Sequence, residues 1–563
     1  MKSKLINLLT KNKIILIFLA IALFACIPYL TAGTIDGDDM CYHLTRIICI
    51  SDELKAGHFP ILIHSEPLNN FGYADPLFYP EIFLYIPAIL INLGLGVMAS
   101  YKFFIILITF STTAIMYYSM NRIMKNSSKS LFISLLYTLA TYRLGDVFVR
   151  AALGEILAFT FLPLVLVGLY EIIFGENKKW WIICLGIFGV VNCHVISAVF
   201  VLILIIIICL INIKKIFKDK KRIKNLVLAG IVSILLSLSF ILPYLEQTFN
   251  DDFRFNILDN AHFLEGGASS LQDFLKNELK GTGVDFSKGS LLLILAMLIL
   301  NTKDLKWKND EFVIQCFILG IVSAILSSKL LPWENMKFFG IIQFPFRISM
   351  ISELLFSVVA GEAVFRNFKN SESIKLLVIF IIFIAGTQLS NVNINKNDVT
   401  YEKLVANYPL AMREYCPVNF DNSYSFVCMV EDEPGVEKNV YGEFLNYIDS
   451  DKNIINRENI NTIDYKQDGT KIEFYYDKQA PFTIHIPLTY YKGYVAYLKE
   501  DNGECHDLKL EKEQSTANII VSSDENLTGT IVVEYKMTII QKIGYTFSLV
   551  ALIGLIVYVV KKK

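Results

Sequence analysis

Charged side chains are scarce in this sequence. Asp, Glu, Lys and Arg make up 19% of its 563 residues, whereas hydrophobic residues make up 54% and the mean hydropathy is +0.48. A soluble domain carries about 25% charge, so the composition excludes an ordinary soluble protein and predicts one embedded in a membrane. The net charge is −1, and a chain without a basic excess argues for no nucleic-acid partner.

Signature motifs of several enzyme classes are also missing. The sequence has no Walker loop, no GxGxxG followed by an acid, no HExxH and no Cys–His spacing for zinc. These absences argue against P-loop nucleotidases, Rossmann dinucleotide enzymes and zinc proteases. An enzymatic activity must then rest on the acidic and arginine side chains of the chain.

Long apolar runs are abundant. Runs of roughly 18 or more apolar residues recur, and each is long enough to cross about 30 Å of hydrocarbon. Basic clusters at residues 1–13, 214–224 and 561–563 mark the cytoplasmic side. We therefore expect a plasma-membrane protein that crosses the bilayer about twelve times, with both termini in the cytoplasm. The expected spans are 14–30, 101–120, 130–142, 154–174, 180–193, 195–212, 226–244, 286–301, 312–330, 348–364, 374–390 and 543–560.

Two regions allow more than one interpretation. The apolar run 180–212 is long enough for one steep span or for two short spans broken near Asn192 and His194. The segment 81–98 is apolar but contains Pro87 and several Gly and Asn residues. We expect it to be a shallow or half-inserted helix, because a full span there would move the basic loop that starts at Arg122 to the outer side.

The composition becomes polar after residue 390. Segments such as KIEFYY, FTIHIP, YVAYL and TIVVEY alternate between apolar and polar residues, which predicts half-buried strands. The sequence thus divides into a transmembrane domain with outer loops (1–390), an extracytoplasmic β-rich domain (391–538) and a final helix with a basic tail (539–563). At most one disulfide is possible within the β-rich domain, which contains Cys416, Cys428 and Cys505.

The stretch TIDGDDMCYHLTRI, directly after the first span, gathers polar side chains at the outer membrane surface: Asp36, Asp38, Asp39, His43 and Arg46. Apolar residues then recur at helical spacing, which predicts an amphipathic helix on the membrane, capped by Asp38 or Asp39 and stopped at Gly57. His43 and Arg46 share one face of this helix. The cluster is either an acidic cap beside a solvated helix face or a catalytic and substrate-binding site.

Two further outer segments place arginine beside a span. Arg150 and Glu155 run into the span that starts near 154, and Arg347 enters a span after IIQFPF. Rim charges of this kind form structural pairs or mark a substrate path. Arg347 can fork onto a phosphate or snorkel to lipid headgroups. Tyr79, in the segment GYADPLFYP, is either an interfacial anchor or a substrate contact.

Several segments carry a family resemblance. DDMCYHLTRI, GHFPILI, GYADPLFYP, IIQFPFR and, in the outer region, IPLTYYKGYVAYL are similar to segments of bacterial YfhO-type membrane proteins. They also resemble a related set labelled 6-pyruvoyl-tetrahydropterin synthase-related, although this chain has no zinc-binding His set for pterin chemistry. The architecture as a whole resembles the GT-C superfamily of membrane glycosyltransferases.

This resemblance implies a function and a site. GT-C enzymes use a polyprenyl-phosphate sugar and place an Asp of the first outer loop at the active site. Carried over, that residue is Asp39, with Asp36 and Asp38 as rivals. A carboxylate there can deprotonate an acceptor hydroxyl or hold a divalent metal such as Mg or Mn; Asp146 and Glu155 are the candidates for a second acid.

We therefore expect a GT-C-like glycosyltransferase at the outer face of the bilayer. It would move a sugar from a polyprenyl phosphate to an envelope glycan or lipid acceptor. The expected catalytic residues are Asp39, Asp36, Asp38 and His43, and the expected substrate-binding residues are Arg46, Arg150, Glu155, Arg347 and Tyr79. The alternatives are a lipid-linked glycan transporter or flippase, and a non-enzymatic envelope assembly protein.

Overall fold

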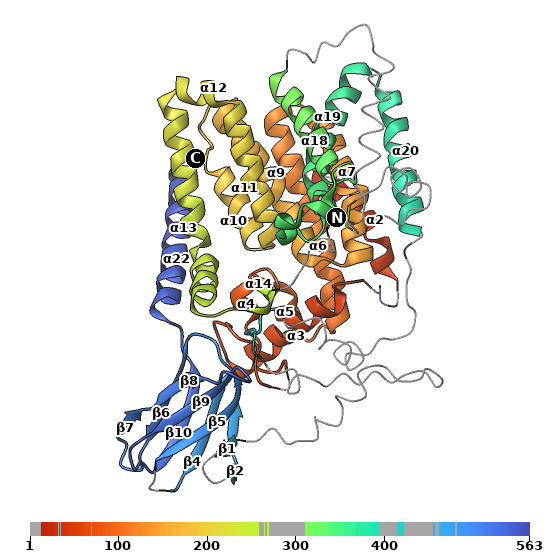
Figure 1. The fold of residues 1–563 in the computed structure, drawn as a ribbon. Helices are drawn as coiled ribbons and strands as arrows, with labels where there is room; N and C mark the ends of the chain where they lie inside the picture. Colours follow the sequence, from red (N-terminus) through yellow and green to blue (C-terminus); the bar gives the residue numbers. More distant parts are fainter. Residues whose placement is uncertain are drawn as a thin grey trace.

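The fold consists of a helical bundle with a β-sandwich at one end (Figure 1). The structure is a computed structural model, and it describes residues 13–31, 33, 35, 37–68, 70–257, 264, 267–268, 310–368, 370–390, 392, 414–420, 454–456, 461–478 and 481–562. A layer of short helices lies between the bundle and the sandwich (Figure 1).

Six helices of the described chain are long and apolar enough to cross a membrane, which identifies a membrane protein. They are α6 (Val97–Met124), α9 (Leu153–Ile173), α13 (Lys220–Asn250), η6 with α19 (Pro345–Ile348 and Ser349–Asn367), α20 (Ser371–Ser390) and α22 (Ile539–Lys561). A seventh span is possible where α7 (Ser127–Thr138) meets a second helical piece, Thr141–Arg150, at a 42° bend. That piece comprises α8 (Thr141–Gly145) and a π-helical turn, η2 (Asp146–Arg150).

Shorter apolar helices complete the bundle: α2 (Lys13–Ala25), α10 (Ile182–Val191), α11 (Val195–Ile211) and α18 (Glu311–Leu326). Every expected span except 286–301 coincides with a helix, and 286–301 lies outside the described residues. The number twelve therefore stays a prediction. The run 180–212 forms two short helices, and His194 is the N-cap of the second, accepting from the Ser197 N–H. The segment 81–98 contains only α5 (Tyr85–Asn92) ahead of α6, and eight residues rise only about 12 Å.

The basic segment 214–224 and the β-sandwich lie at opposite ends of the bundle (Figure 1). The basic end is formed by α12 (Ile213–Lys218) and the start of α13, and α22 runs from the sandwich along α13. The two long helices approach closely at Gly544, where an added Cβ would lie 2.6 Å from the Leu238 carbonyl oxygen. Ser548 Oγ donates to the Leu235 carbonyl at 3.0 Å.

The layer between bundle and sandwich contains η1 (Ile27–Leu30), α3 (Met40–Ala56), α4 (Asp75–Phe78), α5 and α14 (Arg254–Ile257). Three 3₁₀ turns, η4 (Trp333–Asn335), η5 (Lys337–Ile342) and η6, lead into α19. The predicted helix after the first span is confirmed as α3. It stops at Gly57, which has φ 86°, a left-handed conformation that favours glycine.

The sandwich has two five-stranded antiparallel sheets, in the orders β2-β1-β5-β9-β8 and β3-β4-β10-β6-β7. All four predicted strand segments are confirmed, as β4, β5, β6 and β10. The strands are β1 (Ile454–Asn456), β2 (Asn461–Ile463), β3 (Lys466–Asp468), β4 (Lys471–Tyr476), β5 (Phe482–Thr489), β6 (Tyr494–Lys499), β7 (Cys505–Asp507), β8 (Lys509–Lys512), β9 (Asn518–Ser523) and β10 (Gly529–Tyr535). The apolar residues that alternate in these segments are the buried side chains, and the polar ones point outward, as in β4.

The sandwich shares a hydrophobic core with the outer loops of the bundle. Leu62, Leu77 and Phe78 pack in the same buried cluster as the strands. Gln247 in α13 exchanges two hydrogen bonds with the Lys492 backbone, at 2.8 and 3.0 Å. This core contains residues from both sides of the boundary predicted near residue 390. The division into domains therefore stays a prediction.

Candidate functional site

The backbone before α3 is fixed against the end of the π-helical turn. The Asp38 N–H donates to the Val149 carbonyl at 3.2 Å, and the Asp39 N–H to the Arg150 carbonyl at 2.7 Å. Gly37 permits this approach, because an added Cβ would lie 2.6 Å from the Ala151 Cβ. The first outer loop is thereby pinned to the second, and Asp39 is held beside Arg150.

The Asp39 carboxyl is half-buried and does not cap the helix. Asp39 occupies the N-cap position, as predicted, but its side chain makes no capping hydrogen bond. Burial raises the pKa of Asp39 above its usual range; Glu155 and Asp38 add to the rise, and Arg150 and Arg347 oppose it. Asp38 is exposed beside it, and Asp36 lies outside the described residues.

Glu155 joins Arg150 and Arg347 at the N-terminal end of α9. Arg150 Nη2 and Arg347 Nε each lie 2.8 Å from the same oxygen, Glu155 Oε1. The other oxygen accepts from the Tyr142 hydroxyl at 2.7 Å, and Arg150 Nη1 donates to Asp146 at 2.7 Å. The structure thus brings together four sequence-predicted site residues, Asp39, Arg150, Glu155 and Arg347.

Arg347 is oriented by the turn that precedes its span. Its Nη1 donates to the Gln343 side chain at 2.5 Å, and its guanidinium lies 5.0 Å from the centroid of the Phe344 ring. Arg347 is only 7% exposed. A snorkelling arginine extends toward lipid headgroups and water, whereas this side chain turns inward onto Glu155.

Tyr79 closes one side of the cluster. Its hydroxyl lies over Gly154, where an added Cβ would be 2.0 Å from the oxygen, so only glycine fits below it. The ring stacks on Tyr42 at 5.9 Å and meets His194 edge-on at 6.0 Å. Tyr79 is half-buried. Its side chain lies beside the first turn of α9, the helix that contains Glu155.

The predicted solvated face of α3 is buried instead. His43 and Arg46 are each 2% exposed, because the outer loop 58–81 folds over the helix. Burial lowers the pKa of His43 well below its usual range, and the cations of Arg46 and Arg150 lower it further. His43 is therefore a neutral, enclosed imidazole, and its catalytic role stays a prediction. Arg46 cannot meet a substrate, because its guanidinium is enclosed by protein groups.

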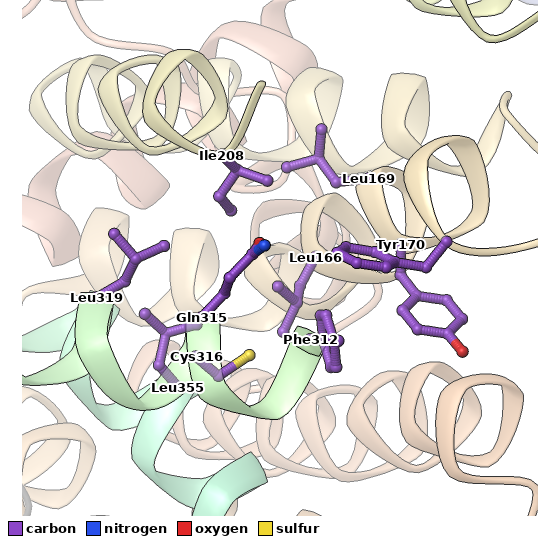
Figure 2. A pocket seen from close by; sticks show the side chains of 10 residues that line it. Leu166, Leu169, Tyr170, Ile208, Phe312, Gln315, Cys316, Leu319 and Leu355 are labelled. Atoms are coloured by element: carbon purple, nitrogen blue, oxygen red, sulfur yellow. The ribbon is translucent and has the colours of Figure 1, made fainter. Parts of the chain in front are cut away.

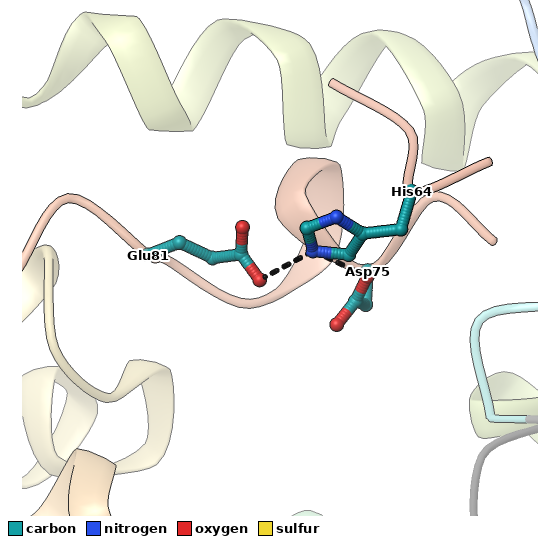
Figure 3. Close-up of side chains that lie close together, drawn as sticks. All are labelled: His64, Asp75 and Glu81. Carbon is teal, nitrogen blue, oxygen red and sulfur yellow. Dashed lines mark hydrogen bonds and ion pairs between the residues drawn. The ribbon is translucent and has the colours of Figure 1, made fainter. Parts of the chain in front are cut away.

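The partners of Arg46 were not predicted from the sequence. Asp75 and Glu81 lie against it, and His64 lies against both acids. All three are buried, and Figure 3 shows them together. Residues 64 and 73 form an isolated antiparallel bridge that places His64 beside Asp75. No helical or strand periodicity relates positions 64, 75 and 81, so no local signal could have grouped them.

Glu414 is a second residue that the sequence did not indicate. It belongs to a short segment, 414–420, that passes between bundle and sandwich, and its carbonyl accepts from the Phe255 N–H at 2.9 Å. Burial raises the pKa of Glu414; Arg347 opposes the rise and Asp39 adds to it. This half-buried carboxyl therefore lies within electrostatic reach of both site residues.

Binding of a divalent metal at Asp39 was one of two roles that the sequence left open for this carboxylate. Among the described residues, two groups of three side chains have ligand atoms close enough to share an ion: His64 with Asp75 and Glu81, and Glu500 with Glu504 and His506. Asp39 belongs to neither. In the first group the Arg46 guanidinium already lies 2.8 Å from Glu81 Oε1 and 3.2 Å from Asp75 Oδ2, so we assign no metal there.

An apolar hollow opens at the opposite end of α9 (Figure 2). Its lining includes Leu166, Tyr170, Phe312 and Leu319, and one polar side chain, Gln315, reaches it. From Glu155 to Leu169 the helix rises about 20 Å. This hollow is therefore separate from the Asp39 cluster.

Comparisons with known proteins find distant matches in sequence and in structure. No family model matches it. An uncharacterised protein of Lactococcus lactis subsp. cremoris (strain MG1363) is 22% identical over 97% of this chain and 95% of its own length. Two cryo-EM structures of the arabinofuranosyltransferase AftD from Mycobacteria, one of them a mutant, share 13% sequence identity with this chain at a TM-score of 0.44. The match covers 68% of this chain but only 28% and 26% of the two AftD chains.

Proposed function

We propose that this protein is a membrane glycosyltransferase that acts at the outer face of the plasma membrane. It transfers a sugar from a polyprenyl-phosphate donor to an envelope glycan or lipid acceptor. The observation that carries the proposal is the convergence of Asp39 with Arg150 and Arg347 at the sandwich end of the bundle. A base and two phosphate-binding groups are what transfer from a sugar phosphate requires.

The acid–base step falls to Asp39. The acceptor hydroxyl oxygen attacks the anomeric carbon of the donor, and its proton passes to the Asp39 carboxylate. The bond between that carbon and the phosphate oxygen breaks, and the phosphate leaves with the electron pair. A raised pKa suits a general base, because the affinity of the carboxylate for the proton it takes rises with its pKa.

The leaving phosphate falls to the two arginines. In the described part of the chain, Arg347 Nη2 and Arg150 Nε donate to no acceptor, whereas their other nitrogens are held by Glu155, Asp146 and the Gln343 turn. Guanidinium groups bind phosphate oxygens in a fixed, paired geometry. Preorganised cations at a developing negative charge are a large term in catalysis.

The charge pattern supports an outward-facing site. The basic segment 214–224 lies at the end of the bundle away from the Asp39 cluster (Figure 1), and basic residues favour the cytoplasm. A transporter would instead need charges along a path through the bundle. Arg143, buried deeper, is held by the Thr138 carbonyl at 3.2 Å and the Thr109 hydroxyl at 2.9 Å, so it serves packing rather than a path.

The test is sugar transfer by the purified protein in lipid. A panel of radiolabelled polyprenyl-phosphate sugars is offered with envelope lipids and glycans as acceptors. Transfer with at least one donor supports the proposal, and donor movement across vesicles without transfer would instead identify a flippase. Arg347→Lys should then weaken apparent donor affinity about ten- to a hundredfold, because lysine keeps the charge but not the fork.

A further inference from the structure

Arg46 belongs to a buried network of four side chains, together with Asp75, Glu81 and His64. Its Nε lies 2.8 Å from Glu81 Oε1 and 3.2 Å from Asp75 Oδ2. His64 Nε2 lies 3.0 Å from the same Glu81 oxygen and 3.5 Å from the other oxygen of Asp75, Oδ1 (Figure 3). Two cations thus face two acids within the protein interior.

The network ends on the backbone of Tyr79. Arg46 Nη2 donates to the Tyr79 carbonyl at 2.9 Å and to the Pro80 carbonyl at 3.1 Å. The same guanidinium lies 4.3 Å from the centroid of the Tyr79 ring. Arg46 therefore contacts both the main chain and the ring face of one residue, and its Nε lies against the two acids.

Tyr79 in turn faces the Asp39 cluster. Its hydroxyl rests on Gly154, the residue next to Glu155, and its ring edge meets His194. Of the aromatic residues 78 and 79, Phe78 points the other way and packs on Phe253 at 4.6 Å in the sandwich core. The direction of the 79 side chain is thus set by the backbone that Arg46 fixes.

We propose that Arg46, anchored by Asp75, Glu81 and His64, is a positioning residue that aims Tyr79 at the sugar or phosphate of the donor. The assignment rests on the proposed function for the identity of that ligand. Arg46 acts through Tyr79 and touches no substrate. Charged partners suit this role, because a buried ion network tolerates few geometries and so fixes the groups attached to it.

A labelling experiment tests the positioning without any transfer assay. Tyr79→Cys is made in a chain whose exposed Cys505 is replaced by Ser, and the rate of reaction with a water-soluble maleimide is measured. Arg46→Lys keeps the charge but cannot bond both carbonyls and Glu81 together. We expect Arg46→Lys to change the labelling rate about ten- to a hundredfold. This factor corresponds to the free energy of the hydrogen bonds that a charged donor makes.

Glu81→Gln is the second variant, since it keeps side-chain size and removes the anchor of Arg46 Nε. The matched control is Arg122→Lys, which alters an arginine–carboxylate pair with Glu171 near the other end of the bundle and should leave the rate unchanged. Equal rates for wild type, Arg46→Lys and Glu81→Gln would overturn the proposal.

A double-mutant cycle links the positioning to the donor. If Arg46 acts through Tyr79, Arg46→Lys adds little to the rise in donor KM caused by Tyr79→Phe. Additive effects would show that Arg46 acts by another route. If the wild-type protein transfers no sugar at all, the proposed function fails, while the labelling rates still decide whether Arg46 positions residue 79.

Discussion

Arg347 Nε lies 2.8 Å from Glu155 Oε1, although 192 residues separate the two in the chain. The bond ties the entrance of α19 to the start of α9 beside Asp39. Both side chains are buried, so each requires the other. Breaking one partner of a buried ion pair leaves an uncompensated charge.

Glu155→Gln is therefore expected to destabilise the protein and to abolish transfer. Two arginines lose their shared acceptor, and removing one partner of a buried pair costs about 3–5 kcal/mol. Thermal unfolding in detergent and sugar transfer measure the two effects. Glu171→Gln is the control, because Glu171 pairs with Arg122 near the other end of the same helix. A Glu171→Gln variant that also lost all transfer while folded would contradict a local role for Glu155.

Asp39→Asn should remove the base and leave the fold intact. The amide has nearly the size of the carboxyl, and the Asp39 side chain makes no capping bond that it would lose. A general base contributes on the order of 10²–10⁴-fold in rate. Transfer is measured at matched membrane levels, with the exposed neighbour changed in Asp38→Asn as control. Full activity of Asp39→Asn would exclude base catalysis at this position.

The pH dependence of transfer should report on Asp39. A base must be ionised, so activity rises with pH through the pKa of Asp39, which burial and its acidic neighbours raise. Asp38 is one of those neighbours, and Asp38→Asn removes its contribution. The acidic limb of the pH–rate profile should then move to lower pH. A limb that stays in place, or moves to higher pH, would show that another group titrates.

The His64 network should make the fold less stable at alkaline pH. Burial opposes the imidazolium, but the Glu81 and Asp75 carboxylates outweigh it and raise the pKa of His64 from 6.5 to about 9. The contribution is complete below pH 6.5 and is lost as the pH rises to about 9, for about 3 kcal/mol in all. Unfolding is compared at pH 6 and pH 9, and His64→Gln should show a smaller difference than wild type.

Gly154→Ala should displace Tyr79. An added Cβ would lie 2.0 Å from the Tyr79 hydroxyl and 2.9 Å from the Cys193 carbonyl oxygen, so the ring must move away from Glu155. We expect donor KM to rise about tenfold or more, because the displaced Tyr79 hydroxyl loses its hydrogen bond to the donor. Gly554→Ala in α22 is the matched control, because an added Cβ there meets nothing within 4 Å. Unchanged donor use by Gly154→Ala would exclude Tyr79 from the site.

The sequence by itself determined the membrane helices, the strands and the first outer helix. These follow from local physical properties: apolar length for α9 and α13, strict alternation for β4 and β10, and helical spacing with a terminal glycine for α3. The sequence also identified Asp39, Arg150, Glu155 and Arg347 as candidate site residues, because charged side chains beside a bilayer are costly unless they are paired or functional.

Only the tertiary structure decided which of these charges meet. The contact between Arg347 and Glu155, the bond from the Asp39 N–H to Arg150 and the approach of Glu414 join segments far apart in the chain. The tertiary structure also excluded one of the two interpretations of the polar face of α3, a face open to water. Arg46 lies on the helical face that the sequence pattern assigned to water, but the loop 58–81 folds over it and supplies Asp75, Glu81 and His64. Periodicity reports which face of a helix is polar, whereas the partner that covers that face is set by packing between distant segments.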